Sequence, residues 1–592
     1  MNETDRQALF ERLLGNQLRR ILALVDPEVR GEVVVADSFA LAPRNAEPPP
    51  DGAGPAPKYE SLLSYSRTEP RLEVIANGLR RALSLGRLRG NGKPLAVDGF
   101  RLRELRQWSN YRVGSLGDNV GAISSYCNCD CEFCYEKGTR GAGIALGRAQ
   151  LSRRELGTRV RYYSVDKGAG LLPSSRFSLE PFANPHCLEI LERIHAAAPE
   201  ERVSITTNGA CLTEEVVERL SRLRPIMMTV SMNAATVELR NRTMRDRIPD
   251  GARIALDSIA RLRQHEIPFL GSYVPWPSKP LSDMEDMVRL LDRYDAVVAR
   301  ICLPSWTKYS HRDDPFDPAE YWAEIVASVE RLRQEVAIPI HLMPNMYQLH
   351  TMRPVVQGTI KHSPAAQAGF RYGDLIVEIE GERVFTRPEV SRWLAKRYDE
   401  PEVTNTRFAV ERDGERMEID IPRPRSLEEL SYPYYWLAQP NAPRTWAGAL
   451  GLHLADGFEL TTFVRLKEIA EEYPGKRILL FISELGEPYF HEGMEMLGEL
   501  GAFVDTVDLY VQKLHPRYWG GNVLIGDLWT VTDLIEQTQS WVQSHGLRPD
   551  VVIVPSSFLS HGGRDLVGRC YADFERDLDL ELRLLRCRCI AI

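Results

Sequence analysis

The densest group of chemically reactive side chains in the sequence is a cysteine-rich stretch at residues 125–135. Four of the ten cysteines fall within eight residues there, at positions Cys127, Cys129, Cys131 and Cys134. Cysteines this close together cannot reach disulfide geometry without severe backbone strain, so a disulfide framework is excluded. Soft thiolates on a short loop instead favour an iron–sulfur cluster or zinc.

Zinc is the weaker of these two alternatives. It would need a fourth protein ligand from a second Cys-x-x-Cys pair, and the sequence holds no other such pair. Cys127, Cys131 and Cys134 form a Cys-x3-Cys-x2-Cys pattern, and the spacing of Cys129 to its neighbours is too tight for a regular zinc knuckle. A cubane cluster held by three thiolates leaves one iron open, and chemistry can take place at an open iron.

This cysteine pattern resembles that of the radical S-adenosylmethionine (SAM) enzymes. The resemblance implies that Cys127, Cys131 and Cys134 hold a [4Fe-4S] cluster whose open iron chelates SAM. It further implies that one electron from the cluster cleaves SAM to a 5′-deoxyadenosyl radical, with flavodoxin or ferredoxin as the type of electron donor. Phe133, just before the last thiol, is expected to contact the adenine through its backbone.

A strand-end carboxylate follows the cysteines. Residues 176–180 read as a strand that ends at Glu180, and the next residues are Pro-Phe-Ala-Asn-Pro. This segment resembles the Gly-Gly-Glu-Pro motif of the family, with Ser178 and Leu179 in place of the two glycines. A carboxylate here would accept charge-assisted hydrogen bonds from the SAM ammonium. The alternative is a surface carboxylate that closes a strand.

Two further strand ends resemble SAM-contacting motifs. Residues 203–209 form a β-branched run that ends in Thr207-Asn208-Gly209, which the family places near the SAM ribose. Residues 227–234 end in Ser231-x-Asn233, which the family uses for the SAM carboxylate or ribose hydroxyls. A guanidinium fork matches a carboxylate, so an arginine soon after this strand is expected to bind SAM; Arg240 is the candidate and Arg242 the alternative.

The elements that must position these residues alternate between strand and helix signals from residue 119 onward, which is typical of a parallel α/β sheet. Further strands are predicted at 267–275, 296–304 and 338–342. Active sites of such folds lie at the carboxyl ends of the strands. We therefore predict an α/β fold with a partial (β/α)6 TIM-like barrel, the radical SAM core, over residues 119–350. An N-terminal helix and Pro-rich linker (1–57) and a helical lead-in (58–118) precede it.

Residues 351–425 resemble a bacterial PDZ domain, predicted as a β-rich insertion. Ala-Gly followed by Gly-Asp at 368–374 marks tight turns, and Asp413-Gly414 marks a β-hairpin. PDZ grooves bind an extended peptide by adding a strand to a sheet edge. Two alternatives stay open here: a peptide or protein ligand fills the groove, or the chain itself fills it.

Residues 426–592 return to an α/β pattern, with strands predicted at 477–483, 506–511 and 550–555. This tail resembles the C-terminal domain of PDZ-containing iron–sulfur oxidoreductases related to molybdopterin and nitrogenase-cofactor biosynthesis. The cysteine loop also resembles that of a related archaeal arginine-methylating group that uses cobalamin, which makes cobalamin a candidate ligand of the tail. Cys570, Cys587 and Cys589 are candidate ligands of a second cluster, with free thiols as the alternative.

Composition limits the remaining classes. A chain of 592 residues is too long for one core, and its net charge of −8 gives no general electrostatic footprint for nucleic acid. No apolar run approaches a membrane span, and the first residues lack the layout of a signal peptide. A cytoplasmic location is expected, where reduced thiolates can bind metal.

The sequence thus predicts a radical SAM oxidoreductase or transferase that modifies a C–H bond of a peptide or a small natural-product substrate. A cobalamin-dependent radical SAM methyltransferase is one alternative. A non-catalytic iron–sulfur and PDZ adaptor, or a redox sensor, is the other. Glu180, Ser231 and Asn233 argue against this second alternative, because a protein that merely holds a cluster needs no SAM pocket.

Overall fold

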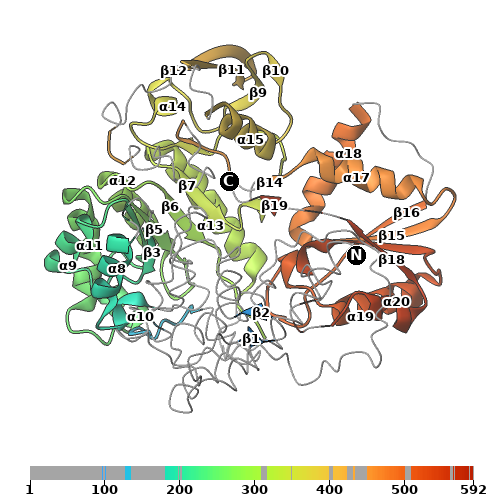
Figure 1. Cartoon of the computed structure of the whole chain (residues 1–592), viewed down its shortest axis with the longest axis horizontal. Coiled ribbons are helices and arrows are strands. Elements are labelled where there is room, and N and C mark those ends of the chain that lie inside the picture. Colours follow the sequence, from blue (N-terminus) through green and yellow to red (C-terminus); the bar gives the residue numbers. More distant parts are fainter. Residues whose placement is uncertain are drawn as a thin grey trace. The chain divides into compact units, whose positions relative to one another are not determined.

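The computed structural model of the chain is shown in Figure 1. It describes residues 127–134, 180–197, 203–308, 316–347, 350–398, 404–422, 431–433, 450–455, 457–499, 508–559 and 569–585, with short pieces at 96–97, 100–101, 124, 199, 565, 567, 587 and 589–590. The N-terminal helix, the Pro-rich linker and residues 176–179 of the strand predicted at 176–180 lie outside the described residues. So do residues 119–126 at the start of the predicted barrel, apart from Ser124. Within the predicted helical lead-in, β1 (Ala96–Val97) and β2 (Phe100–Arg101) form an antiparallel pair.

The described residues between 114 and 457 form one compact unit, and those between 458 and 589, together with β1 and β2, form another. The first unit contains a five-stranded parallel sheet in which the strands neighbour one another in sequence order. The predicted α/β architecture and the strands predicted from residue 203 onward in this unit are therefore confirmed. The strands are β3 (Val203–Thr207), β4 (Ile226–Ser231), β5 (Phe269–Tyr273), β6 (Ala299–Cys302) and β7 (Ile340–Met343).

Helices alternate with these strands along the chain (Figure 1). Their starts follow from side-chain caps: Thr213 accepts from the backbone N–H of Val216, and Asp317 caps a helix whose first residue is Pro318. Position 271 in β5 has little room for a side chain, since a Cβ there would lie 2.4 Å from side-chain carbons of Leu291. The helices are α8 (Cys187–Ala197), α9 (Glu214–Ser221), α10 (Val237–Met244), α11 (Gly251–Gln264), α12 (Leu281–Arg293) and α13 (Pro318–Glu335), with single turns η4 (Pro181–Ala183) and η5 (Asn345–Tyr347).

The predicted β-rich insertion is a four-stranded antiparallel sheet in the order β10–β9–β11–β12. Its hairpin turns at Asp413-Gly414, where both residues have positive φ (52° and 82°), as the predicted tight turn requires. The strands are β9 (Leu375–Ile379), β10 (Glu382–Arg383), β11 (Asn405–Arg412) and β12 (Glu415–Pro422), accompanied by helices α14 (Pro364–Gln367) and α15 (Arg387–Tyr398).

A later segment of the chain completes the core of this insertion. Strand β13 (Leu452–His453) pairs antiparallel with β8 (Gly358–Thr359). Leu450, Leu452 and Leu454 alternate along the segment, and all three are buried in the same core as Val390 and Leu394 of α15. The insertion predicted from the sequence ended at residue 425, so these leucines extend it.

Two histidines join this segment to the parallel sheet. The Nδ1 atom of His341 on β7 lies 3.3 Å from Nε2 of His453, whose side chain is 1% exposed. Burial, the neighbouring His453 and the positive charges of Arg300 and Arg333 hold the pKa of His341 well below its usual range. The pair is therefore stable only while the His341 imidazole is neutral.

We expect the pair to make stability pH-dependent. Below a pH of about 6.5 the unfolded chain protonates His341 but the folded chain does not. The free energy of unfolding should therefore fall as the pH is lowered, by at most about 1.4 kcal/mol for each pH unit. Above that pH neither state is charged and the contribution vanishes. Urea unfolding between about pH 7.5 and about pH 5.5 measures it. His341→Gln should flatten the profile; an equal slope in both proteins would contradict the assignment.

The second unit contains a four-stranded parallel sheet in the order β16–β15–β17–β18. The three strands predicted in the C-terminal region are confirmed, as β15 (Arg477–Ile482), β16 (Asp508–Lys513) and β17 (Val551–Pro555). The sequence did not predict β18 (Glu581–Leu585). The helices are α17 (Leu460–Glu471), α18 (Glu487–Glu499), α19 (Val531–His545) and α20 (Ala572–Leu578), with turns η7 (Glu484–Gly486), η8 (Gly526–Leu528) and η9 (Ser556–Phe558) and short strands β14 (Gly457–Phe458) and β19 (Cys589–Ile590).

Trp529, Phe481 and Phe558 lie in the buried core of this second unit. A capping box between Thr530 and Asp533 begins α19 beside that core. Throughout the described part of the chain, no helix combines the length and the apolar character that a membrane crossing requires.

Candidate active site

The cysteine loop lies against the end of helix α10. The backbone N–H groups of Asp130 and Glu132 donate to the carbonyls of Met244 and Thr243, at 2.9 and 3.0 Å. In return, the N–H of Arg247 donates to the carbonyl of Asn128 at 3.0 Å. Three backbone hydrogen bonds thus fix residues 128–132 on the connection that follows β4.

The four thiols of the loop differ in their surroundings. Cys127, Cys131 and Cys134 are partly exposed, whereas Cys129 is buried and its Sγ donates to Oδ1 of Asp246 at 2.7 Å. The backbone N–H of Cys129 at 3.4 Å and Nδ2 of Asn208 at 3.9 Å both donate to Sγ of Cys127, and these donors lower the pKa of its thiol. Metals bind the thiolate form, which these donors favour at Cys127.

A set of three thiolates suits a cubane. Among the described residues, no three Cys, His, Asp or Glu side chains are arranged to hold one metal ion. Three thiolates of a cubane bind three different irons, so their sulfurs need not converge on one point. The buried Nδ2 of Asn128 also has no hydrogen-bond partner among the described groups, and such a donor beside the thiols can be satisfied by cluster or thiolate sulfur.

Glu180 lies directly before η4 and is 1% exposed. Its Oε1 accepts from Oγ1 of Thr207 at 2.7 Å and from the N–H of Phe182 at 3.2 Å, and its Oε2 accepts from the N–H of Asn208 at 2.6 Å. Burial raises the pKa of Glu180 to about 7 despite these donors. The structure therefore brings together three of the predicted SAM-site residues, and the surface-carboxylate alternative for Glu180 is wrong.

Asn208 also connects the end of β3 to the cysteine loop. Its Nδ2 donates to Oδ1 of Asn128 at 2.7 Å. Gly209 follows with φ +82°, and a Cβ at this position would come within 3.0 Å of Val230. The turn thus requires the glycine of the Thr-Asn-Gly sequence. The same turn points the N–H of Asn208 toward Glu180.

The predicted residues at the end of β4 have structural partners of their own. Asn233 adopts a left-handed conformation (φ 54°), and its Oδ1 accepts from the N–H of Val274 at 2.8 Å. Ser231 ends β4 and is half-buried. These contacts place both residues at the same edge of the sheet as Asn208, while their contact with SAM stays a prediction.

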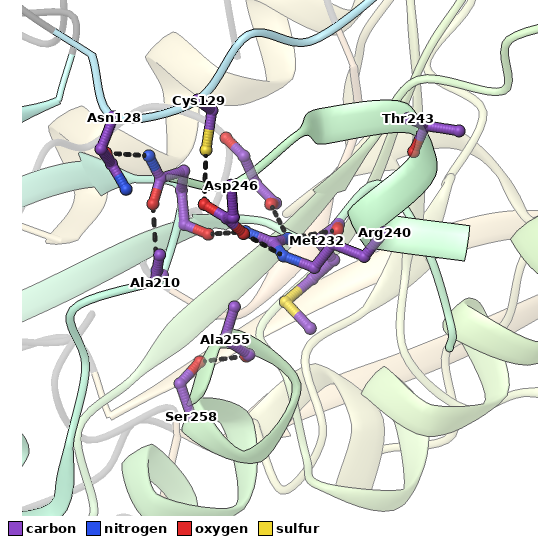
Figure 2. A network of polar contacts seen from close by, with 12 residues as sticks. Asn128, Cys129, Ala210, Met232, Arg240, Thr243, Asp246, Ala255 and Ser258 are labelled. Carbon is purple, nitrogen blue, oxygen red and sulfur yellow. Dashed lines mark hydrogen bonds and ion pairs between the residues drawn. The ribbon is translucent and has the colours of Figure 1, made fainter. Parts of the chain in front are cut away.

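The sequence predicted that the guanidinium of Arg240 binds SAM, but in the structure this group is buried and bonded to the protein itself. Its side chain is 0% exposed, and its nitrogens donate to the carbonyls of Asn208, Ser231 (3.1 Å) and Met232 (2.7 Å) and to Oδ2 of Asp246 (3.2 Å). Figure 2 shows this network reaching Cys129 through Asp246. Arg240 therefore holds the ends of β3 and β4 together. The alternative, Arg242, donates to the carbonyl of Ser278.

Lys279 is a buried residue of this site that the sequence did not indicate. Only 4% exposed, it donates to the carbonyls of Asn233 at 2.6 Å and Val274 at 2.7 Å. Its Nζ lies 4.1 Å from the ring centre of Tyr273 and 4.9 Å from that of Phe133. Burial lowers the pKa of Lys279 to about 7. In the sequence it resembles any lysine of a polar turn, so local pattern carries no signal for it.

Aromatic side chains cover the site beside the loop. Phe133 and Trp276 are buried in one apolar cluster with Cys129, and Trp306 and Phe316 pack against it. The rings of Trp306 and Phe316 meet edge-on at 4.9 Å between centroids. Such a wall excludes water and strengthens every charge interaction inside it.

Of the C-terminal cysteines, Cys570 and Cys587 have side chains that the structure describes. Cys587 is buried, and burial raises the pKa of its thiol to about 12. Cys570 packs against the core of the second unit. The side chain of Cys589 lies outside the described residues. Burial therefore disfavours the thiolate of Cys587, and the second cluster and cobalamin stay predictions.

Two family models match the chain. Residues 122–291 match the radical SAM superfamily, and residues 355–404 match a PDZ domain. A stretch of 79 residues, 13% of the chain, is 35% identical to a protein of Brucella suis biovar 1 named as a zinc metalloprotease. That stretch covers 20% of the metalloprotease, so the chain spans about a fifth of the length of the curated relatives it matches.

Solved structures give weaker similarities. Streptococcus suis SuiB bound to S-adenosylmethionine is 15% identical, with 48% of this chain and 63% of SuiB covered and a TM-score of 0.28. The FeFe-hydrogenase maturase HydG from Carboxydothermus hydrogenoformans is 12% identical, with coverages of 57% and 71% and a TM-score of 0.28. Because these scores are low, the domain assignments rest on the two family matches.

Proposed function

We propose that this protein, which contains a radical SAM domain and a PDZ domain, is an enzyme that cleaves SAM reductively and modifies a C–H bond of a peptide or small natural-product substrate. The family match implies an enzyme with a [4Fe-4S] cluster and SAM. One observation supports this chemistry most directly: the buried Glu180 carboxylate, held by Thr207 and Asn208 at the strand end that contacts the cysteine loop.

In this proposal Cys127, Cys131 and Cys134 hold the cluster, which when bound supplies the electron that splits SAM into methionine and a 5′-deoxyadenosyl radical. Glu180 binds the SAM ammonium. Among the described residues Oε2 has one donor, the N–H of Asn208, so on their account an acceptor position is left for a ligand. An ammonium there would stabilise the ionised carboxylate, whose pKa of about 7 reflects its burial.

Aromatic residues next to the cysteine loop exclude water from the proposed site. Trp276, Trp306 and Phe316 keep water from the region around Phe133, which protects a radical from unwanted quenching. A flavodoxin- or ferredoxin-type donor, a peptide or protein ligand of the PDZ domain and a cytoplasmic location complete the proposal. Kinship with the molybdopterin and nitrogenase-cofactor branch stays a prediction.

Anaerobic reconstitution tests this function. Dithionite-reduced protein with SAM should form 5′-deoxyadenosine, and SAM should change the electron paramagnetic resonance (EPR) spectrum of the reduced cluster. Glu180→Gln should keep its iron but bind SAM about 10- to 100-fold more weakly, because a hydrogen bond to a charged group contributes about 1.5–3 kcal/mol.

Glu189→Gln is the matched control, since Glu189 is a partly exposed carboxylate that pairs with Arg193 on the surface of α8. It should bind SAM as the wild type does. Absence of both 5′-deoxyadenosine and a spectral response in the wild type would overturn the proposed function. Normal SAM affinity in Glu180→Gln would overturn only the role given to Glu180.

A further inference from the structure

The cysteine loop carries four thiols, while the proposed cluster uses three. A fourth thiolate within reach of the open iron would occupy the position that SAM needs, because thiolate is a strong ligand for iron in such clusters. Cys129 lies two residues from both Cys127 and Cys131, and its backbone N–H is 3.4 Å from Sγ of Cys127. The loop therefore holds a competitor for its own open iron.

The structure shows what restrains that competitor. The Sγ of Cys129 donates to Oδ1 of Asp246, at a distance of 2.7 Å. Its side chain also packs with Phe133, Met244 and Trp276 in the apolar cluster, so the sulfur has both a polar and an apolar contact away from solvent.

Asp246 is in turn held by Arg240. Their side chains are 1% and 0% exposed, and Nε of Arg240 lies 3.2 Å from Oδ2 of Asp246. A buried ion pair is rigid only when its other polar groups are satisfied. Here the remaining nitrogens of Arg240 donate to the carbonyls that follow β3 and end β4. The carboxylate that holds Cys129 is thus fixed to the rigid sheet (Figure 2).

We propose that Arg240 and Asp246 are positioning residues that restrain the Cys129 sulfur and so keep the fourth iron of the cluster open for SAM. This inference rests on the proposed function. Removing the charge of Asp246 weakens this hydrogen bond, and Cys129 can then bind that iron as an intramolecular ligand, whose effective concentration is on the order of millimolar or more. SAM then has to displace a thiolate.

The test compares Asp246→Asn with Asp246→Asn/Cys129→Ala, each reconstituted with its cluster. Asp246→Asn should contain about four irons per chain, yet bind SAM at least about tenfold more weakly and show little change in its EPR spectrum on SAM addition. The double variant should regain the SAM response, because the competing thiol is gone. Cys129→Ala alone should respond as the wild type does.

Rescue by loss of a thiol separates this role from a merely structural one. If Asp246→Asn weakens SAM binding and the double variant does not recover, the inference is overturned. The inference is also overturned if Asp246→Asn responds normally while the wild type responds to SAM. If the wild type itself gives no response, the proposed function has failed instead. Asp246→Glu, which keeps the charge opposite Arg240 but moves the acceptor, replaces Asp246→Asn in both proteins should the latter not fold.

Discussion

Cys131→Ala should lose the iron–sulfur cluster, while Cys129→Ala should keep it. Cys131 is a partly exposed thiol at the proposed ligand spacing, whereas the buried Cys129 sulfur is engaged by Asp246. A cubane with only two protein thiolates is poorly held, so iron and sulfide should fall from about four of each per chain to near background. Iron and sulfide analysis of anaerobically reconstituted protein, together with its visible absorption, measures this difference.

The two variants are well matched, because each removes one thiol from the same loop and the positions are two residues apart. A general disturbance of the loop would lower the iron content of both proteins. Equal loss in the two would therefore show that the ligand assignment is wrong. Full retention of iron and sulfide in Cys131→Ala would also show that the ligand assignment is wrong.

Arg240→Met should destabilise the protein by about 3–5 kcal/mol. The substitution leaves the Asp246 carboxylate buried without its positive partner, and removing one member of a buried pair has a cost of this size. The carbonyls of Asn208, Ser231 and Met232 lose a donor as well. Urea unfolding monitored by tryptophan fluorescence measures the change.

Arg242→Met is the control for this prediction. Arg242 lies two residues further along the same helix and donates to one surface-accessible carbonyl, that of Ser278. Its loss should change the free energy of unfolding by no more than about 0.5 kcal/mol. Similar stability of the two variants would contradict the bracing role of Arg240.

The elements of the sheet could be predicted because their signals are local. The β-branched run at 203–209 ends at a glycine that the turn requires, and the hairpin at Asp413-Gly414 has the two positive φ angles that these residue types favour. Glu180 could be found because residues 178–181 resemble a family motif in which a carboxylate precedes proline. Its burial and hydrogen bonds agree with that expectation.

The contacts that sequence could not predict depend on residues far apart in the chain. Whether Arg240 or Arg242 faces the sheet is decided by the packing of α10, and both are arginines on one short helix. Lys279 is buried because the carbonyls of Asn233 and Val274 converge on it, which no neighbouring residue reveals. Asp246 follows an arginine and precedes another, a setting that in sequence suggests only a solvated turn.

Strand β13 pairs with β8 although it is synthesised about ninety residues later, and this order affects folding during translation. Residues 355–422 can form their hairpin as they leave the ribosome, but Leu450, Leu452 and Leu454 complete the core only after a further stretch has been synthesised. Until then the nascent chain lacks three buried members of this core, and apolar surface exposed in this way is prone to aggregation. The core of this region can therefore be completed only after residue 454 has been synthesised. A fragment intended for peptide-binding studies of this region should extend through residue 455.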